Sequence, residues 1–122
     1  MSKVERFEDL NCWKKSREVV SLIYQLTNAE PFSRDFDLRS QLRRCTVSVM
    51  TNIAEGFGRI SKKEFIRFLD ISLGSLSETK SLLYVAKDVG YLSESVRGDV
   101  YEQLEEIKRM ILGLIVHLKK SL

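Results

Sequence analysis

The apolar residues of this chain recur every three or four positions over four separate segments, which is the repeat of an amphipathic α-helix. No segment alternates every second residue, as a half-buried β-strand would. The last segment has the clearest repeat, with a 4-3-4-3-4 spacing through Val100, Leu104, Ile107, Ile111, Leu114 and Leu118. The periodicity therefore predicts a fold built from helices alone.

Capping and turn residues divide the 122 residues into four helices, expected at about 10–28, 36–56, 61–89 and 93–121. Candidate N-terminal caps precede them in order: Asp9 or Asn11, Asp35 or Asp37, Ser61 in a capping box with Glu64, and Ser93. Gly56 and Gly90 are expected to end the second and third helices, because glycine readily takes the left-handed conformation common there. Pro31, the one proline, is placed in the first loop.

The same spacing predicts the inner face of each helix. The first helix has one stripe at Leu10, Trp13, Arg17, Val20, Tyr24 and Thr27, and a second beside it at Val19, Leu22, Ile23 and Leu26. The second helix carries Leu38, Leu42, Cys45, Val49 and Ile53. The third carries Phe65, Phe68, Leu69, Leu76, Leu83 and Ala86, with Ser72 and Thr79 as small residues in the same stripe.

Four amphipathic helices joined by short connections pack as antiparallel neighbours. The sequence therefore predicts an all-α, antiparallel up-down-up-down four-helix bundle, in one domain that spans residues 1–122. Between Met110 and Leu118 the fourth helix is apolar nearly all round, and such a helix is buried on every side. This surplus indicates a partner, most simply a second copy of the chain; the alternative is that neighbouring long side chains cover it.

Composition argues against most catalytic sites. The one histidine is His117, with Leu114 three positions before it, whereas a carboxylate-bridged di-metal site needs Glu-x-x-His on two helices. Cys12 and Cys45 lie on apolar helical stretches, where cysteine more often packs than reacts. We therefore expect neither an enzyme nor a cofactor or metal site.

The ends and the charge of the chain bear on its location and partners. The segment Met1–Asp9 is charged and has no apolar core, so no signal peptide is expected. The apolar run 110–118 is about half of the ~20 residues that a membrane span needs. The expectation is a cytoplasmic protein with reduced thiols and no membrane partner. The net charge of +3, from 20 Lys+Arg against 17 Asp+Glu, permits a nucleic-acid partner without requiring one.

Basic residues gather between the second and third helices. This group consists of Arg59, Lys62, Lys63 and Arg67. Lys63 and Arg67 repel each other at a spacing of four residues, which indicates an anionic partner. The start of the third helix also favours phosphate. The alternative is an ordinary solvated helix end, at which Glu64 pairs locally.

A second basic group lies on the second helix, at Arg39, Arg43 and Arg44. Here pairing is the stronger alternative, because three carboxylates are near enough in sequence: Asp35, Asp37 and Glu55. Weak basic patches of this kind would add through avidity if several copies of the chain assembled in a ring.

Other polar and aromatic residues have simpler interpretations. Asn52 and Glu55 share one helix face and could form a polar site, but a helix end with Glu55 paired to Arg59 is preferred. Glu78 is expected on the helix surface or in an inter-helix ion pair. Trp13 could stack on a base, although its spacing favours the core or an interface.

Several runs of the chain resemble one small bacterial family. They lie at 7–16, 41–56, 64–69, 74–78 and 90–92, and the most specific is Asn52-Ile-Ala-Glu-Gly56 with its flanks. Together they are similar to the 23S rRNA intervening-sequence family, also called S23 ribosomal protein or four helix bundle protein. Met50 departs from the pattern, because relatives often carry proline there.

The resemblance implies a bundle that commonly assembles into a homopentamer. Genes of the family lie inside intervening sequences of 23S rRNA genes and also stand alone. A distant relative, the accessory protein of diversity-generating retroelements, binds a reverse transcriptase and nucleic acid. RNA binding within the family itself is mostly inferred.

The sequence thus supports two function classes. The first is a non-enzymatic oligomeric bundle that binds RNA or a ribonucleoprotein partner through phosphate contacts. Its expected nucleic-acid-binding residues are Arg59, Lys62, Lys63 and Arg67, followed by Arg43 and Arg44. The second is a protein-interaction scaffold that holds a protein client and has no nucleic-acid role.

Overall fold

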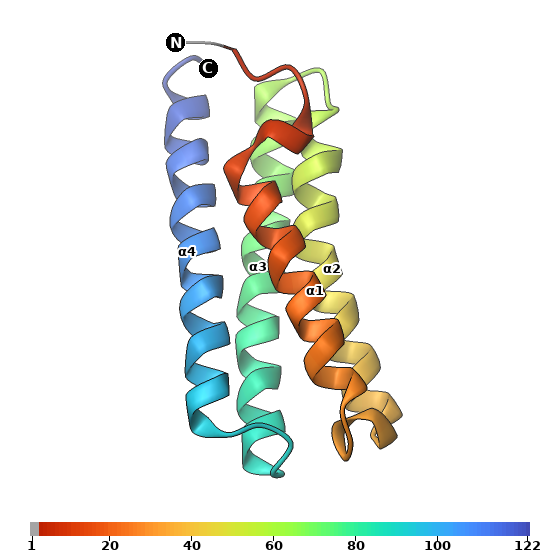
Figure 1. The fold of residues 1–122 in the computed structure, drawn as a ribbon. Coiled ribbons are helices and arrows are strands. Elements are labelled where there is room, and N and C mark those ends of the chain that lie inside the picture. Colours follow the sequence, from red (N-terminus) through yellow and green to blue (C-terminus); the bar gives the residue numbers. More distant parts are fainter. Residues whose placement is uncertain (1–2) are drawn as a thin grey trace.

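Four helices run alternately in opposite directions and form an up-down-up-down bundle (Figure 1). The computed structural model describes residues 3–122, and within this range it contains no strand. The helices are α1 (Asn11–Asn28), α2 (Phe36–Phe57), α3 (Lys62–Asp88) and α4 (Glu94–Lys119). Single 3-10 turns, η1 (Phe7–Asp9) and η2 (Phe32–Arg34), precede α1 and α2. The predicted all-α bundle is confirmed.

The alternating direction places distant parts of the chain together at the two ends of the bundle. The terminal end holds the segment before α1 from residue 3 onward, the C-terminus and the α2–α3 loop, residues 58–61 (Figure 1). The loop end holds the α1–α2 and α3–α4 connections, residues 29–35 and 89–93. Among the described residues, no helix is both long and apolar enough to cross a membrane.

Side-chain caps start three of the four helices. The carboxylate of Asp35 accepts a hydrogen bond from the Leu38 amide at 3.2 Å, and the hydroxyl of Ser93 accepts from Val96 at 3.1 Å. Ser61 accepts from the Glu64 amide at 3.1 Å, but the Glu64 carboxylate binds Arg67 instead of completing the capping box.

Helix α1 starts without a side-chain cap, so the predicted Asp9 or Asn11 cap is wrong. Its N-cap residue is Leu10, which makes no side-chain capping bond. The turn η1 leads directly into the helix, and backbone bonds connect the two, with the Leu10 amide donating to the Phe7 carbonyl at 3.0 Å. The preceding turn therefore occupies the place of a polar cap.

Gly90 ends α3 as predicted. Its φ is +90°, and the Tyr91 amide donates to the Ala86 carbonyl at 2.8 Å while the Gly90 amide donates to Lys87 at 3.0 Å. These two bonds are those of a Schellman motif, which needs a left-handed residue.

The role predicted for Gly56 is wrong. Gly56 lies inside α2, without a positive φ, and Gly58 is the C-cap residue. A Cβ atom at position 56 would lie 2.7 Å from the Cβ of Phe68 and 2.9 Å from Cδ1 of Phe65. Glycine is needed here because α2 and α3 approach each other closely.

The buried faces of α2 and α3 include every residue that the spacing predicted. In α4 the prediction fails at one position, because Ile115 is buried while Leu114 is only partly so. In α1 the first predicted stripe is wrong at four of its six positions: Leu10 and Thr27 are buried, but Trp13 and Val20 are only partly buried and Arg17 and Tyr24 are exposed. The buried residues within α1 are Cys12, Ser16, Val19, Ile23 and Thr27. Of the second predicted stripe, Val19 and Ile23 are buried, while Leu22 and Leu26 are partly buried.

Candidate nucleic-acid interface

Basic residues from two distant parts of the chain meet at the terminal end of the bundle. We call this group the basic corner: Arg59, Lys62, Lys63, Arg67, Lys119 and Lys120. The Lys62 ammonium donates a hydrogen bond to the Ser121 hydroxyl at 2.6 Å, which joins the start of α3 to the end of α4. Because α3 and α4 are antiparallel, the end of α4, which carries Lys119 and Lys120, lies at the same end of the bundle as the loop cluster that the sequence identified (Figure 1).

One residue of the basic corner has its charge compensated. The Arg67 guanidinium donates to both carboxylate oxygens of Glu64, at 3.1 and 3.2 Å. This pair lowers the pKa of Glu64, chiefly through the hydrogen bond, and raises the pKa of Arg67. The local pairing considered from sequence therefore holds for Arg67.

The other cations of the basic corner are not paired in this way. Within residues 3–122, neither Arg59, Lys62 nor Lys63 has a carboxylate oxygen within 4 Å. The expected Glu55–Arg59 pair does not form; instead the Arg59 guanidinium lies 4.7 Å from the centre of the Phe68 ring. The exposed side chains of Lys62 and Lys63 thus present positive charge that forms no ion pair with a described residue.

Arg43 and Arg44 lie elsewhere, about 20 Å along α2 from the corner at 1.5 Å per residue. The Arg43 Nε donates to the Thr27 hydroxyl at 2.8 Å, and its guanidinium covers the Tyr24 ring at 4.4 Å. Arg44 is exposed. The structure therefore divides the predicted site residues into two separate places.

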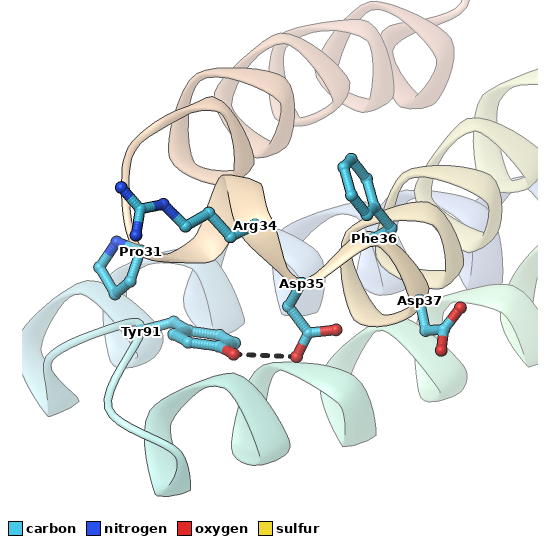
Figure 2. Close-up of a pocket in the computed structure, with 6 residues that line it drawn as sticks. All are labelled: Pro31, Arg34, Asp35, Phe36, Asp37 and Tyr91. Carbon is cyan, nitrogen blue, oxygen red and sulfur yellow. Dashed lines mark hydrogen bonds between the residues drawn. The ribbon is translucent and has the colours of Figure 1, made fainter.

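The carboxylates expected to neutralise the helix-2 arginines do not do so. Over the described part of the chain, no carboxylate lies within 4 Å of Arg39, Arg43 or Arg44. Asp35 is occupied at the loop end, where it caps α2 and accepts a hydrogen bond from the Tyr91 hydroxyl at 2.9 Å (Figure 2). That bond also raises the pKa of Tyr91.

The pocket around this Asp35–Tyr91 bond does not suit an anion. Its volume is about 580 Å³, and it is lined by Pro31, Arg34, Asp35, Phe36, Asp37 and Tyr91 (Figure 2). Two carboxylates belong to the wall, and Arg34 is paired with Glu30 at 3.1 Å. A phosphate would be repelled here, so the loop end is not part of the candidate interface.

The remaining candidates from the sequence pack within the bundle or lie on its surface. Trp13 is partly buried and packs edge-on against Phe7 with ring centres 5.1 Å apart. Asn52 donates to the carbonyl and the hydroxyl of Ser48, both at 2.9 Å. Glu78 is exposed and forms no ion pair with any residue in the described range.

Neither the two thiols nor the histidine belongs to a metal-binding group among the residues that the structure describes. Cys12 and Cys45 are buried free cysteines, and burial raises the pKa of both, to about 11 for Cys12. His117 is exposed at the end of α4. Residues 3–122 contain no cluster of three or more His, Cys, Asp or Glu side chains arranged to hold a metal ion.

The family of the chain follows from comparison with known proteins. The model of the family described as 23S rRNA-intervening sequence protein matches residues 8–113. The chain belongs to this family. The resemblance predicted from the sequence is thereby confirmed, and this match covers all of α1, α2 and α3 and most of α4.

A solved structure shares the fold of this 23S rRNA-intervening sequence family member. It is a protein of unknown function from the S23 ribosomal protein family of Bacteroides thetaiotaomicron. The two chains are 24% identical and superpose with a TM-score of 0.77, over 85% of this chain and 97% of that one. The comparison with curated proteins finds no match.

Proposed function

We propose that this member of the 23S rRNA-intervening sequence family is a non-enzymatic RNA-binding protein. Its contacts to RNA phosphates are made by the basic corner, above all Arg59, Lys62, Lys63 and Arg67, and by Arg43 and Arg44 on α2. The observation that carries the proposal is the contact between Lys62 and Ser121, which joins residues 59–67 to the end of the chain that carries Lys119 and Lys120, where most of the positive charge has no carboxylate partner among residues 3–122.

The geometry of the basic corner suits phosphate better than a base edge. Lysine and arginine side chains at a helix start give point contacts to phosphate oxygens, which position an RNA without reading its sequence. Ser61 caps the Glu64 amide, but the amides of Lys62 and Lys63 at the first turn of α3 make no helical backbone bond. They add a partial positive charge at the same place.

Self-association would multiply this surface. We propose that several copies assemble, as the homopentamer of the family implies, because each chain has a net charge of only +3. Linked weak sites bind much more tightly than single ones. Exposed apolar side chains on α4, Leu112 and Val116, support an interface between copies.

The proposal has two further parts: the protein performs no catalytic step, and it is located in the cytoplasm. The chain's strongest nucleophiles are its two thiols, and both are buried with a raised pKa. A low-pKa, accessible thiolate is the reactive form of cysteine, so neither thiol suits catalysis. Buried, unbridged cysteines are typical of proteins kept in a reducing compartment.

The test is RNA binding by fluorescence anisotropy at several salt concentrations. The wild-type protein should bind a structured RNA, with affinity that falls steeply as salt rises, by about 0.9 in log–log slope per duplex phosphate contacted. The variant Lys62→Glu/Lys63→Glu should bind at least about tenfold more weakly and with a smaller slope.

A matched control separates local contacts from net charge. The variant Lys108→Glu/Arg109→Glu changes the net charge by the same amount on the middle of α4, where Arg109 lies 3.8 Å from Glu102. It should weaken binding less than the corner variant. Equal losses for both variants, or no binding by wild type at low salt, would contradict RNA binding through the basic corner. Absence of binding would favour the scaffold function, to be pursued by identifying a protein client.

A further inference from the structure

A small pocket between α1 and α2 combines an aromatic ring with two arginines. We call it the Tyr24 pocket; its lining residues are Tyr24, Arg43, Arg44, Val47, Ser48 and Thr51, and its volume is about 300 Å³. Helix α1 contributes the ring, and the other residues lie on one face of α2 at spacings of three and four. None of the lining side chains is a carboxylate.

Arg43 is held in place from two sides. Its Nε donates to the hydroxyl of Thr27, which is fully buried and in turn donates to the Ile23 carbonyl at 2.7 Å. Its guanidinium also lies 4.4 Å from the centre of the Tyr24 ring. With Nε bound to the protein, the two terminal nitrogens remain for an external ligand, and across residues 3–122 no carboxylate lies within 4 Å of them.

A second arginine–tyrosine stack, formed by Arg97 and Tyr84, differs from that of Arg43 and Tyr24 because its arginine has a carboxylate partner. Arg97 lies 4.3 Å from the Tyr84 ring, but it also donates to both carboxylate oxygens of Glu94, at 2.6 and 2.9 Å. Its charge is compensated within the protein. Arg43 has the same stacking arrangement without the carboxylate, so its charge is available to an anion from outside.

The remaining features of the Tyr24 pocket match a nucleotide. Tyr24 is 43% exposed, so part of its ring can contact a base, and Arg44 adds a second exposed cation. Arginine pairs with phosphate through two parallel hydrogen bonds. A volume of about 300 Å³ is at the small end of ligand sites, which span ~300–1,000 Å³, and therefore suits one nucleotide.

We propose that the Tyr24 pocket binds one nucleotide of single-stranded RNA, with the base against Tyr24 and the phosphate on Arg43 and Arg44. Bases within a duplex are stacked on each other and cannot lie against a protein ring, so the pocket selects unpaired RNA. This inference rests on the proposed RNA-binding function and adds to it a preference that phosphate contacts at the basic corner do not supply.

The experiment compares a labelled uridine oligomer of about 12 nucleotides with a duplex of equal length, by fluorescence anisotropy. Tyr24→Ala should weaken single-strand binding by about fivefold to a hundredfold, without changing the salt slope, because stacking is not ionic. Duplex binding should not change. Tyr24→Phe should bind like wild type, and Arg44→Glu should weaken binding and reduce the slope by about 0.7 or more.

Tyr84→Ala is the matched control, because it removes the other exposed, arginine-stacked tyrosine, and it should leave RNA binding unchanged. Single-strand affinity of Tyr24→Ala equal to wild type, or an equal loss with duplex, would overturn the inference. In that case a continued effect of Lys62→Glu/Lys63→Glu would leave the proposed function standing. No RNA binding by wild type overturns both. If Tyr24→Ala lost the circular dichroism of its helices, Arg44→Glu would serve as the test in its place. A single-strand affinity of Arg44→Glu equal to that of the wild type would then overturn the proposal that the pocket binds a nucleotide.

Discussion

Gly56 shows how one missing side chain allows two helices to pack closely. Gly56→Ala should destabilise the bundle by about 1–3 kcal/mol, because the added methyl group lies 2.7 Å from Phe68 Cβ and 2.9 Å from Phe65 Cδ1. That overpacking outweighs the gain in helix propensity, which is at most about 1 kcal/mol. Urea unfolding followed by circular dichroism measures the free energy of unfolding.

Gly74→Ala is the control for this substitution. Gly74 lies within α3 with no atom within 4 Å of an added Cβ, so alanine there should stabilise the protein by up to about 1 kcal/mol. A free energy of unfolding for Gly56→Ala at or above the wild-type value would mean that the α2–α3 contact can relax.

Helix α1 shows what the apolar pattern of a sequence can and cannot predict. The pattern predicted its existence and approximate bounds, but most of its first predicted stripe was wrong because the spacing was fitted through Trp13 and Tyr24. Both are large amphipathic rings that remain at the edge of the core. The interior positions include Ser16 and Thr27, whose hydroxyls donate to the helix's own carbonyls at 2.6 and 2.7 Å.

In α2 and α3 the predicted stripe coincides with the buried face, although exposed apolar side chains such as Phe36 on α2 and Ile71 on α3 also occur. For these helices the spacing alone identified the buried residues. In contrast, no periodicity separates a glycine that ends a helix from one that admits a neighbour. Gly56 and Gly90 differ in backbone conformation and in what lies opposite them in the fold, and the apolar spacing of a sequence contains neither directly.

Asp35 stabilises the start of α2 and also joins the two connections at the loop end (Figure 2). Asp35→Ala should therefore lower the free energy of unfolding by about 1 kcal/mol or more, the usual cost of a lost N-cap. Asp37→Ala, in the first turn of the same helix but without a capping bond, should cost less. Equal unfolding free energies for the two variants would show that the cap contributes nothing beyond the charge near the helix start.

The basic corner belongs to the scale of the whole molecule, and the sequence identified four of its six residues. The cluster at residues 59–67 is visible as a run of charges, whereas Lys119 and Lys120 are more than fifty residues away. They join the basic corner because α3 and α4 are antiparallel, so that the end of α4 lies at the same end of the bundle as the start of α3. The predicted bundle topology already implies this arrangement. The sequence identified Arg43 as a basic residue on the second helix, but its contacts with Tyr24 and Thr27 depend on how α1 packs against α2.

Self-association is the last prediction at this scale. Leu112 and Val116 lie one helical turn apart on α4 and are 42% and 55% exposed. An interface that covers them gains free energy from apolar burial, roughly 1–3 kcal/mol in total, because about half of each side chain is already buried in the single copy. Light scattering after size-exclusion chromatography should give a wild-type mass that is a multiple of 14.1 kDa.

The double substitution Leu112→Lys/Val116→Lys should shift that mass toward a single chain, because the interface would then have to bury two ammonium groups. Val89→Lys is the control: Val89 is 56% exposed, but it lies just after α3 at the loop end, away from this face of α4. It should leave the mass unchanged. A wild-type mass of one chain at every concentration would contradict self-association. If Leu112→Lys/Val116→Lys instead kept the same multimeric mass as the wild type and Val89→Lys, the interface would lie on another face.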